Sequence, residues 1–130
     1  MEQKNINNKI FAIPEKIINA MIKDGKVRKG ITKANFFMFF HFYFSHYIQY
    51  QTANFQKRII SYLDINNDDL FVVAFRGSGK STIVTTAYPI WSILGKQQKK
   101  FVIIFCQTKI QAKQHMMNLR TELENNEILK

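Results

Sequence analysis

The sequence has little of several residue types that commonly define a site or a compartment. It contains one cysteine, Cys106, so no disulfide can form within the chain and a reduced, intracellular protein is expected. The three histidines have no cysteine or carboxylate partners at ligand spacing, which argues against a zinc site: His41, His46 and His115. A metal is therefore expected only as Mg²⁺ bound together with a nucleotide.

The sequence also lacks a hydrophobic run long enough to span a membrane. Its densest apolar stretch, Phe36 to Phe44, is interrupted by His41 and falls far short of the roughly 18–20 residues that a spanning helix needs. We expect this stretch to be a helix capped near Thr32 and buried nearly all round. Residues 1–9 have no apolar core of a secretion signal, so a cytoplasmic protein without a membrane partner is expected.

Acidic residues are scarce. Nine Asp and Glu stand against 19 Lys and Arg, which gives a formal net charge of +10. Clustered basic residues bind nucleic acid by releasing counterions, so the charge indicates a polyanionic partner. However, lysine far outnumbers arginine, and an AT-rich coding sequence would produce that bias whatever the function. Both explanations stay open at this point.

An apolar run at the centre of the chain, Leu70 to Phe75, leads through two glycines into a helical pattern. The run has the length and the Val and Phe content of a buried strand, and helical spacing follows from Ile83 to Leu94. The sequence between them reads Ala74-x-x-x-x-Gly79-Lys80-Ser81, which matches a phosphate-binding loop except for the alanine. Glycines let backbone N–H groups surround a phosphate chain, the helix start adds a positive dipole end, and lysine adds an ammonium.

We therefore predict a nucleotide-binding loop whose residues are Gly77, Ser78, Gly79, Lys80, Ser81 and Thr82, with Ser81 as the Mg²⁺ ligand. The alternative is an ordinary strand-to-helix turn with a solvated lysine. Pro89 lies inside the helix that follows and is expected to kink it or to end its regular part early.

The flanking segments predict an α/β domain. Phe101 to Cys106 fits a parallel strand covered on both faces, and Thr108 with Gln111 predicts the capped start of another helix. The core stripe of that helix is expected at Ala112, Met116, Leu119 and Leu123. The order strand, phosphate loop, helix, strand, helix is the front half of a P-loop domain. We expect a truncated P-loop NTPase with a parallel sheet over residues 55–130, preceded by a helical, aromatic-rich segment over residues 1–54.

Four stretches of the sequence together resemble the amino-terminal part of a phage terminase large subunit. They are Val73 to Thr82, Tyr88-Pro89-Ile90-Trp91, Thr108 with Gln111-Ala112, and Glu122 to Leu129. The resemblance implies a motor that drives viral DNA into capsids by ATP hydrolysis, with a nuclease domain after the ATPase domain. It also implies ATP and Mg²⁺ as cofactors, a homo-oligomer in the intact motor, and double-stranded DNA, the terminase small subunit and the portal protein as partners.

The resemblance also implies roles for four residues. Lys80 and Ser81 match the phosphate and Mg²⁺ contacts, and Gln56 matches a glutamine that recognises adenine. Arg76 matches an arginine that acts on the γ-phosphate or senses the nucleotide state, so Arg76 and Lys80 are the expected catalytic residues. Without this context Gln56 is a plain surface residue and Arg76 only packs on the loop.

The acidic residues that ATP hydrolysis needs are not evident. The acids after the loop are Glu122, Glu124 and Glu127, which are expected at the far end of the last helix. We therefore expect this chain alone not to turn over ATP. Two other functions remain open: a fragment of another P-loop translocase related to helicases, and a non-enzymatic module that binds DNA or docks on the capsid.

Overall fold

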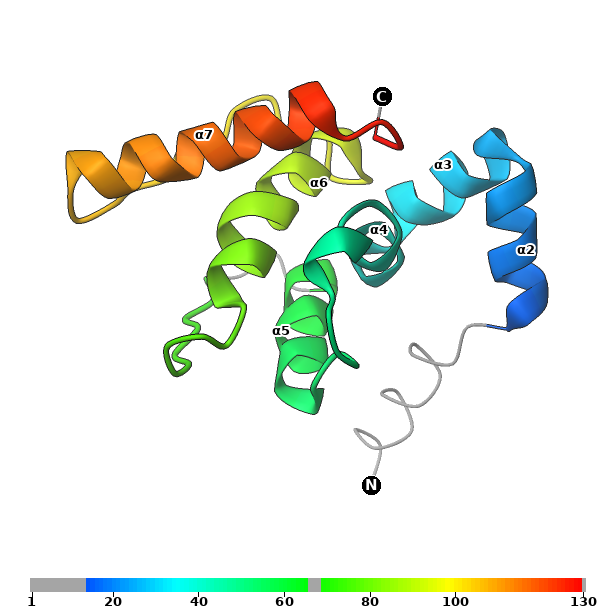
Figure 1. Ribbon diagram of the computed structural model, residues 1–130, viewed down its shortest axis with the longest axis horizontal. Helices are drawn as coiled ribbons and strands as arrows, with labels where there is room; N and C mark the ends of the chain where they lie inside the picture. The colour runs from blue at the N-terminus through cyan, green and yellow to red at the C-terminus, as the bar shows by residue number, and fades with distance from the viewer. Residues whose placement is uncertain (1–13, 66–68, 130) are drawn as a thin grey trace. The chain divides into compact units, whose positions relative to one another are not determined.

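The computed structural model describes residues 14–65 and 69–129 (Figure 1). The contacts within the chain divide it into two units, with the boundary between Ile31 and Thr32. The first unit contains helix α2 (Glu15–Lys23) and the beginning of helix α3 (Gly25–Ala34). Asp24 separates these helices, and its side chain accepts a hydrogen bond of 2.8 Å from the backbone N–H of Lys26. None of the helices in the described ranges is both long and apolar enough to cross a membrane.

The second unit is built around helix α4 (Phe36–Tyr43), which is buried on nearly all sides as expected. Asn35, not Thr32, caps this helix by accepting a 2.9 Å hydrogen bond from the backbone N–H of Met38. The short 3₁₀ turn η1 (Ser45–Tyr47) follows, and helix α5 (Asn54–Ile65) packs against α4. The buried residues of α5 are Ile59, Ile60 and Leu63.

One continuous helix begins at Lys80, directly after the glycines, and ends at Leu94. Its middle is the π-helical turn η2 (Thr82–Ala87), and its last part is helix α6 (Tyr88–Leu94). Pro89 therefore does not end the helix early. A proline removes one backbone hydrogen bond and crowds the carbonyl of the preceding turn, and a wide π turn placed just before it gives room for that ring.

The core of the second unit lies where α4 meets α6. The Trp91 side chain is fully buried, its ring centroid is 5.1 Å from that of Phe36, and its indole N–H donates a 2.9 Å hydrogen bond to the carbonyl of Thr32. The helix is followed by Gly95, where a larger residue would not fit. A Cβ at this position would come within 2.5 Å of the Trp91 carbonyl oxygen and 2.6 Å of its indole nitrogen. The tryptophan thus fixes α6 against the start of α4.

The predicted α/β fold with a parallel sheet is wrong. In the part of the chain that the structure describes there is no strand, and the elements are helices. The two expected strands, Leu70 to Phe75 and Phe101 to Cys106, have no regular secondary structure and form no ladder with each other. Their side chains are largely exposed, with Val73 at 98% and Phe105 at 90%. An apolar run sets the preference for an extended backbone, but a strand also needs a partner for its N–H and C=O groups.

Helix α7 (Lys109–Asn125) begins where the sequence predicts it, with the Thr108 hydroxyl accepting a 3.2 Å hydrogen bond from the backbone N–H of Gln111. Its predicted core stripe is wrong, because Ala112, Met116 and Leu123 are exposed. The buried residue of α7 is instead the carboxylate Glu122. Without a sheet beneath it, α7 packs chiefly beside η2 and has no apolar surface to cover along most of its length.

We expect Gly95→Ala to lower the free energy of unfolding by about 1–3 kcal/mol, because the added methyl would force the Trp91 ring from its place. Gly30→Ala is the matched control, since a Cβ there meets nothing within 4 Å. Alanine inside helix α3 should raise stability by roughly 0.5–1 kcal/mol. Urea denaturation of both variants tests this, and equal stability of the Gly95 variant and the parent would contradict it.

Candidate nucleotide-binding site

The candidate site is built on a glycine loop, Ala74 to Thr82. The loop connects the apolar run that begins at Leu70 to the helix that ends at Leu94. Gly77 has a φ of 81° and Gly79 a φ of 76°, both in the left-handed region that favours glycine. Ser78 lies between them, is buried, and donates a 3.3 Å backbone hydrogen bond to the carbonyl of Phe75. Turns of this kind surround anions with backbone N–H groups. Both glycines of the predicted loop thus adopt the left-handed conformation, which is open at low cost only to residues without a side chain.

Lys80 turns back across this loop. Its ammonium donates a 2.8 Å hydrogen bond to the carbonyl of Ala74, the first residue of the loop. A cavity of about 490 Å³ is lined by the loop alone, residues 74–82. Arg76 and Ser81 are exposed on the lining of this cavity, and Thr82 is half-buried. The structure thus brings together the predicted arginine, lysine and hydroxyl groups around one space.

Gln56 lies beside the loop and ties it to helix α5. Its side-chain oxygen accepts a 3.0 Å hydrogen bond from the N–H of Ala53, and its amide nitrogen donates one of 2.8 Å to the carbonyl of Ser78. A Cβ on Gly79 would come within 2.9 Å of that amide nitrogen, so the glycine also makes room for Gln56. Since a glutamine amide has two N–H groups and two oxygen lone pairs, Gln56 keeps one of each for a ligand.

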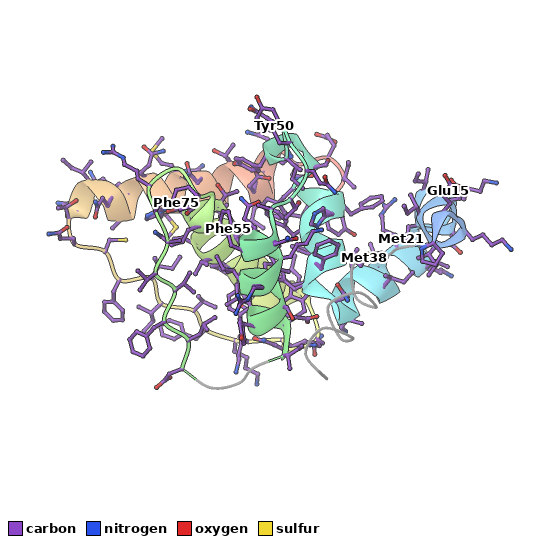
Figure 2. The ribbon with its side chains drawn as sticks, turned by 90° about the horizontal axis from the view of Figure 1, so that it is seen from below. Glu15, Met21, Met38, Tyr50, Phe55 and Phe75 are labelled. Carbon is purple, nitrogen blue, oxygen red and sulfur yellow. The ribbon has the colours of Figure 1, made fainter. Side chains whose placement is uncertain are left out.

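A second cavity, which we call the side pocket, has a volume of about 240 Å³ and adjoins the loop. The loop contributes Gly77, Gly79 and Thr82 to its lining, and Gln56 adds its side chain. Residues 47–52, which we call the wall segment, also line the side pocket. Tyr50 of this segment, labelled in Figure 2, is 84% exposed. This wall segment could not be predicted from the sequence, because it has neither strand nor helix periodicity. Its run of tyrosines and glutamines was the available signal.

One end of the wall segment is held by His41, for which the sequence predicts no functional role. Its Nδ1 lies 2.9 Å from the carbonyl of Phe37 and its Nε2 2.7 Å from the hydroxyl of Thr52. Because a carbonyl only accepts, Nδ1 carries the proton, and in the neutral ring Nε2 accepts from Thr52. Burial lowers the pKa of His41 and the charge of Lys57 acts in the same direction, against the opposing effect of the Phe37 carbonyl. The neutral form therefore holds Thr52.

The other end of the wall segment is held by Glu122. Its Oε1 accepts hydrogen bonds from the Tyr47 hydroxyl at 2.9 Å and from His46 Nε2 at 3.0 Å. Its Oε2 accepts one of 3.0 Å from the amide of Asn126, which also donates 2.7 Å to the carbonyl of Tyr43. Burial by itself raises the pKa of Glu122, but these hydrogen bonds outweigh it and hold the pKa below its ordinary value. Burial and the carboxylate raise the pKa of Tyr47 to about 12.

The acidic residues that follow the loop in the sequence are not arranged to bind a metal ion beside it. Glu122 is fully engaged in the network just described, and Glu124 pairs with Arg120 at 2.7 Å on the same helix. Among the described residues no three His, Cys, Asp or Glu side chains are grouped so that they could hold a metal. A metal at this site would therefore depend on the Ser81 hydroxyl and on the ligand itself.

Acidification should weaken the His41 contact. Between the ordinary pKa of 6.5 and the lower value in the folded protein, the unfolded chain binds more protons, so the free energy of unfolding falls as pH drops below 6.5. We expect His41→Gln, which keeps one donor and one acceptor, to reduce this fall. Urea titrations at pH 6.5 and about one unit below measure it. His115→Gln is the control, and an undiminished fall in the His41 variant would contradict the assignment.

Comparisons of the chain with protein-family models, with curated proteins and with solved structures give no match. The interpretation of the loop and the side pocket therefore depends on the chemistry of their own residues. The two cavities adjoin each other, because Gly77, Gly79 and Thr82 line both of them.

Proposed function

We propose that the glycine loop binds ATP with Mg²⁺, and that the chain is the ATP-binding part of a viral DNA-packaging motor. The observation that carries the proposal is the Lys80 ammonium, which lies 2.8 Å from the Ala74 carbonyl beside a cavity made by the loop alone. A phosphate oxygen is a stronger acceptor for an ammonium than a neutral carbonyl, because charge-assisted hydrogen bonds are roughly twice as strong. A phosphate chain in this cavity would therefore displace the carbonyl.

The residues around the cavity fit the other needs of a triphosphate. Ser81 has an exposed hydroxyl in the first turn of the helix and is the residue that would hold Mg²⁺. When bound, the ion neutralises part of the phosphate charge. Arg76 is exposed on the same cavity and supplies a second cation for the terminal phosphate. Lys80 and Arg76 are thus the residues that would act on the phosphates.

The side pocket fits the base of the nucleotide. A base needs a narrow apolar space with a few placed polar groups, and the pocket offers Phe40 and Ile83 together with the Gln56 amide. The free N–H and the free lone pair of Gln56 match the acceptor and the donor on the edge of adenine. Because the pocket adjoins the phosphate cavity, base and phosphates would belong to one molecule.

The motor function is supported by the resemblance to terminase large subunits and by the charge of the chain. Between Asp69 and Glu122 the sequence has no acidic residue, and its basic residues there are Arg76, Lys80, Lys96, Lys99, Lys100, Lys109, Lys113 and Arg120. Double-stranded DNA is the polyanion that a packaging motor moves, and it would meet this charge. The same function would place the protein in the host-cell cytoplasm, in a homo-oligomer that works with the small subunit and the portal protein.

Lys80→Ala should weaken binding of a fluorescent ATP analogue by about 10–100-fold, the loss expected when a hydrogen bond to a charged group is removed. Lys113→Ala, which removes an exposed lysine from α7, is the matched control and should bind as the parent does. Circular dichroism of each variant shows that it is folded. Equal affinity of the folded Lys80 variant and the parent would refute the assignment of the loop, and failure of the parent to bind would favour a non-enzymatic DNA-binding or capsid-docking module.

We expect the chain by itself not to sustain ATP hydrolysis. Hydrolysis needs a carboxylate that orients the attacking water, and the described acids after the loop are engaged elsewhere or exposed on α7 and beyond it. Phosphate release measured over many equivalents of ATP tests this. Sustained release that Lys80→Ala abolishes would show that the expectation is wrong.

A further inference from the structure

We propose that Glu122 is a positioning residue for the side pocket: through Tyr47 and His46 it holds the wall against which the nucleotide base lies. The proposal rests on the function proposed above and assigns to helix α7 a part in base binding. Glu122 itself does not line the side pocket, so it acts through the residues it holds. Glu122 lies far from the glycine loop in the sequence, so the sequence alone does not predict this role.

The network around Glu122 joins elements that lie far apart in the chain. The carboxylate is only 4% exposed, although most of α7 around it is open to solvent. A buried carboxylate is costly unless its oxygens are hydrogen-bonded, and here both are, by Tyr47 and His46 on one oxygen and Asn126 on the other. Asn126 also binds the Tyr43 carbonyl at the end of α4. The end of α7 is thereby fastened to the turn that precedes the pocket wall.

The attachment to Glu122 adds to two local contacts at the near end of the wall: the N–H of Ile48 donates a 3.0 Å hydrogen bond to the Ser45 carbonyl, and the Tyr47 ring stacks on Phe44. Residues 48–53 form neither helix nor strand, so their backbone is not held by a regular set of hydrogen bonds. At the far end, Thr52 is held by His41 and Ala53 by Gln56. At the near end, Tyr47 lines the pocket and donates to Glu122. The wall is thus a short bridge between two polar attachments.

Hydrogen bonds restrict the position of the wall more than apolar contacts would. Apolar side chains tolerate sliding, whereas three donors around one carboxylate have one arrangement that satisfies all of them. Glu122→Gln replaces one accepting oxygen by an amide NH₂, which then faces the hydroxyl and imidazole on one side or the Asn126 amide on the other. An amide nitrogen that faces the Asn126 NH₂ is a donor against a donor. In the other orientation the Tyr47 hydroxyl can turn and the His46 ring can change tautomer, so that both accept from the amide. In either orientation the hydrogen bonds lose the charge of the carboxylate, which weakens them and loosens the wall.

The test separates the base from the phosphates. ATP would touch the wall and the loop, whereas inorganic tripolyphosphate would touch the loop alone. Glu122→Gln should weaken ATP binding about tenfold, the effect of losing one hydrogen bond to a charged group, and leave the affinity for tripolyphosphate unchanged. Both affinities are measured with Mg²⁺ by competition against the fluorescent ATP analogue. Glu124→Gln is the matched control, because that side chain is 55% exposed and pairs only with Arg120 on its own helix.

The outcomes are distinct. A parent chain that binds neither ligand overturns the proposed function and this inference with it. A parent that binds ATP, with a Glu122 variant that binds it equally well, overturns this inference alone. Equal loss of ATP and tripolyphosphate affinity means that the variant damages the whole fold, which also overturns it. Tyr47→Phe removes a single donor and is used in the same way if Glu122→Gln does not fold, with a selective loss of ATP affinity again the supporting result.

Discussion

The burial of Trp91 is the interaction on which the rest of the second unit depends. Its ring fills the space between α6 and the start of α4, and its N–H binds the carbonyl of Thr32. Because α6 continues without a break from Lys80, fixing the tryptophan also fixes the direction of the helix at whose start the glycine loop lies. In the absence of a sheet in the described residues, this helix carries the loop. The loop is therefore held from its carboxyl side.

Polar side chains hold the rest of the site. Gln56 joins α5 to the loop, His41 joins α4 to Thr52, and Glu122 joins α7 to the turn before the wall segment. Each of these contacts is made by a side chain that reaches across to another part of the chain. Hydrogen bonds in half-buried surroundings are directional, so they determine a shape that apolar packing leaves loose. Two of these contacts hold residues 47–52, those of His41 with Thr52 and of Glu122 with Tyr47, and Gln56 joins the other side of the side pocket to the loop.

The sequence predicts the local features of this protein well. The apolar period places α4, α5 and the helix from Lys80 to Leu94, and the two glycines with Lys80 identify the loop, because these patterns act over a few residues. The sheet was predicted wrongly, since Val73 and Phe105 fit a strand by composition while strand formation depends on distant partners. The core stripe of α7 failed for the same reason. Glu122 was missed because its partners His46 and Tyr47 lie more than 70 residues away, as the separations of 76 and 75 show.

The proposed function depends on the conformation of the glycine loop and on the contact that Lys80 makes with it. The left-handed glycines cost little because they have no side chain, and the Gln56 amide supports the carbonyl between them. Lys80 donates to a neutral acceptor inside its own loop, the Ala74 carbonyl, which a phosphate oxygen would replace in the proposed function. An exchange of a neutral acceptor for a charged one favours the ligand, and a site that is formed in advance loses little conformational entropy on binding. In the proposed function, the lysine would thus exchange one acceptor for another.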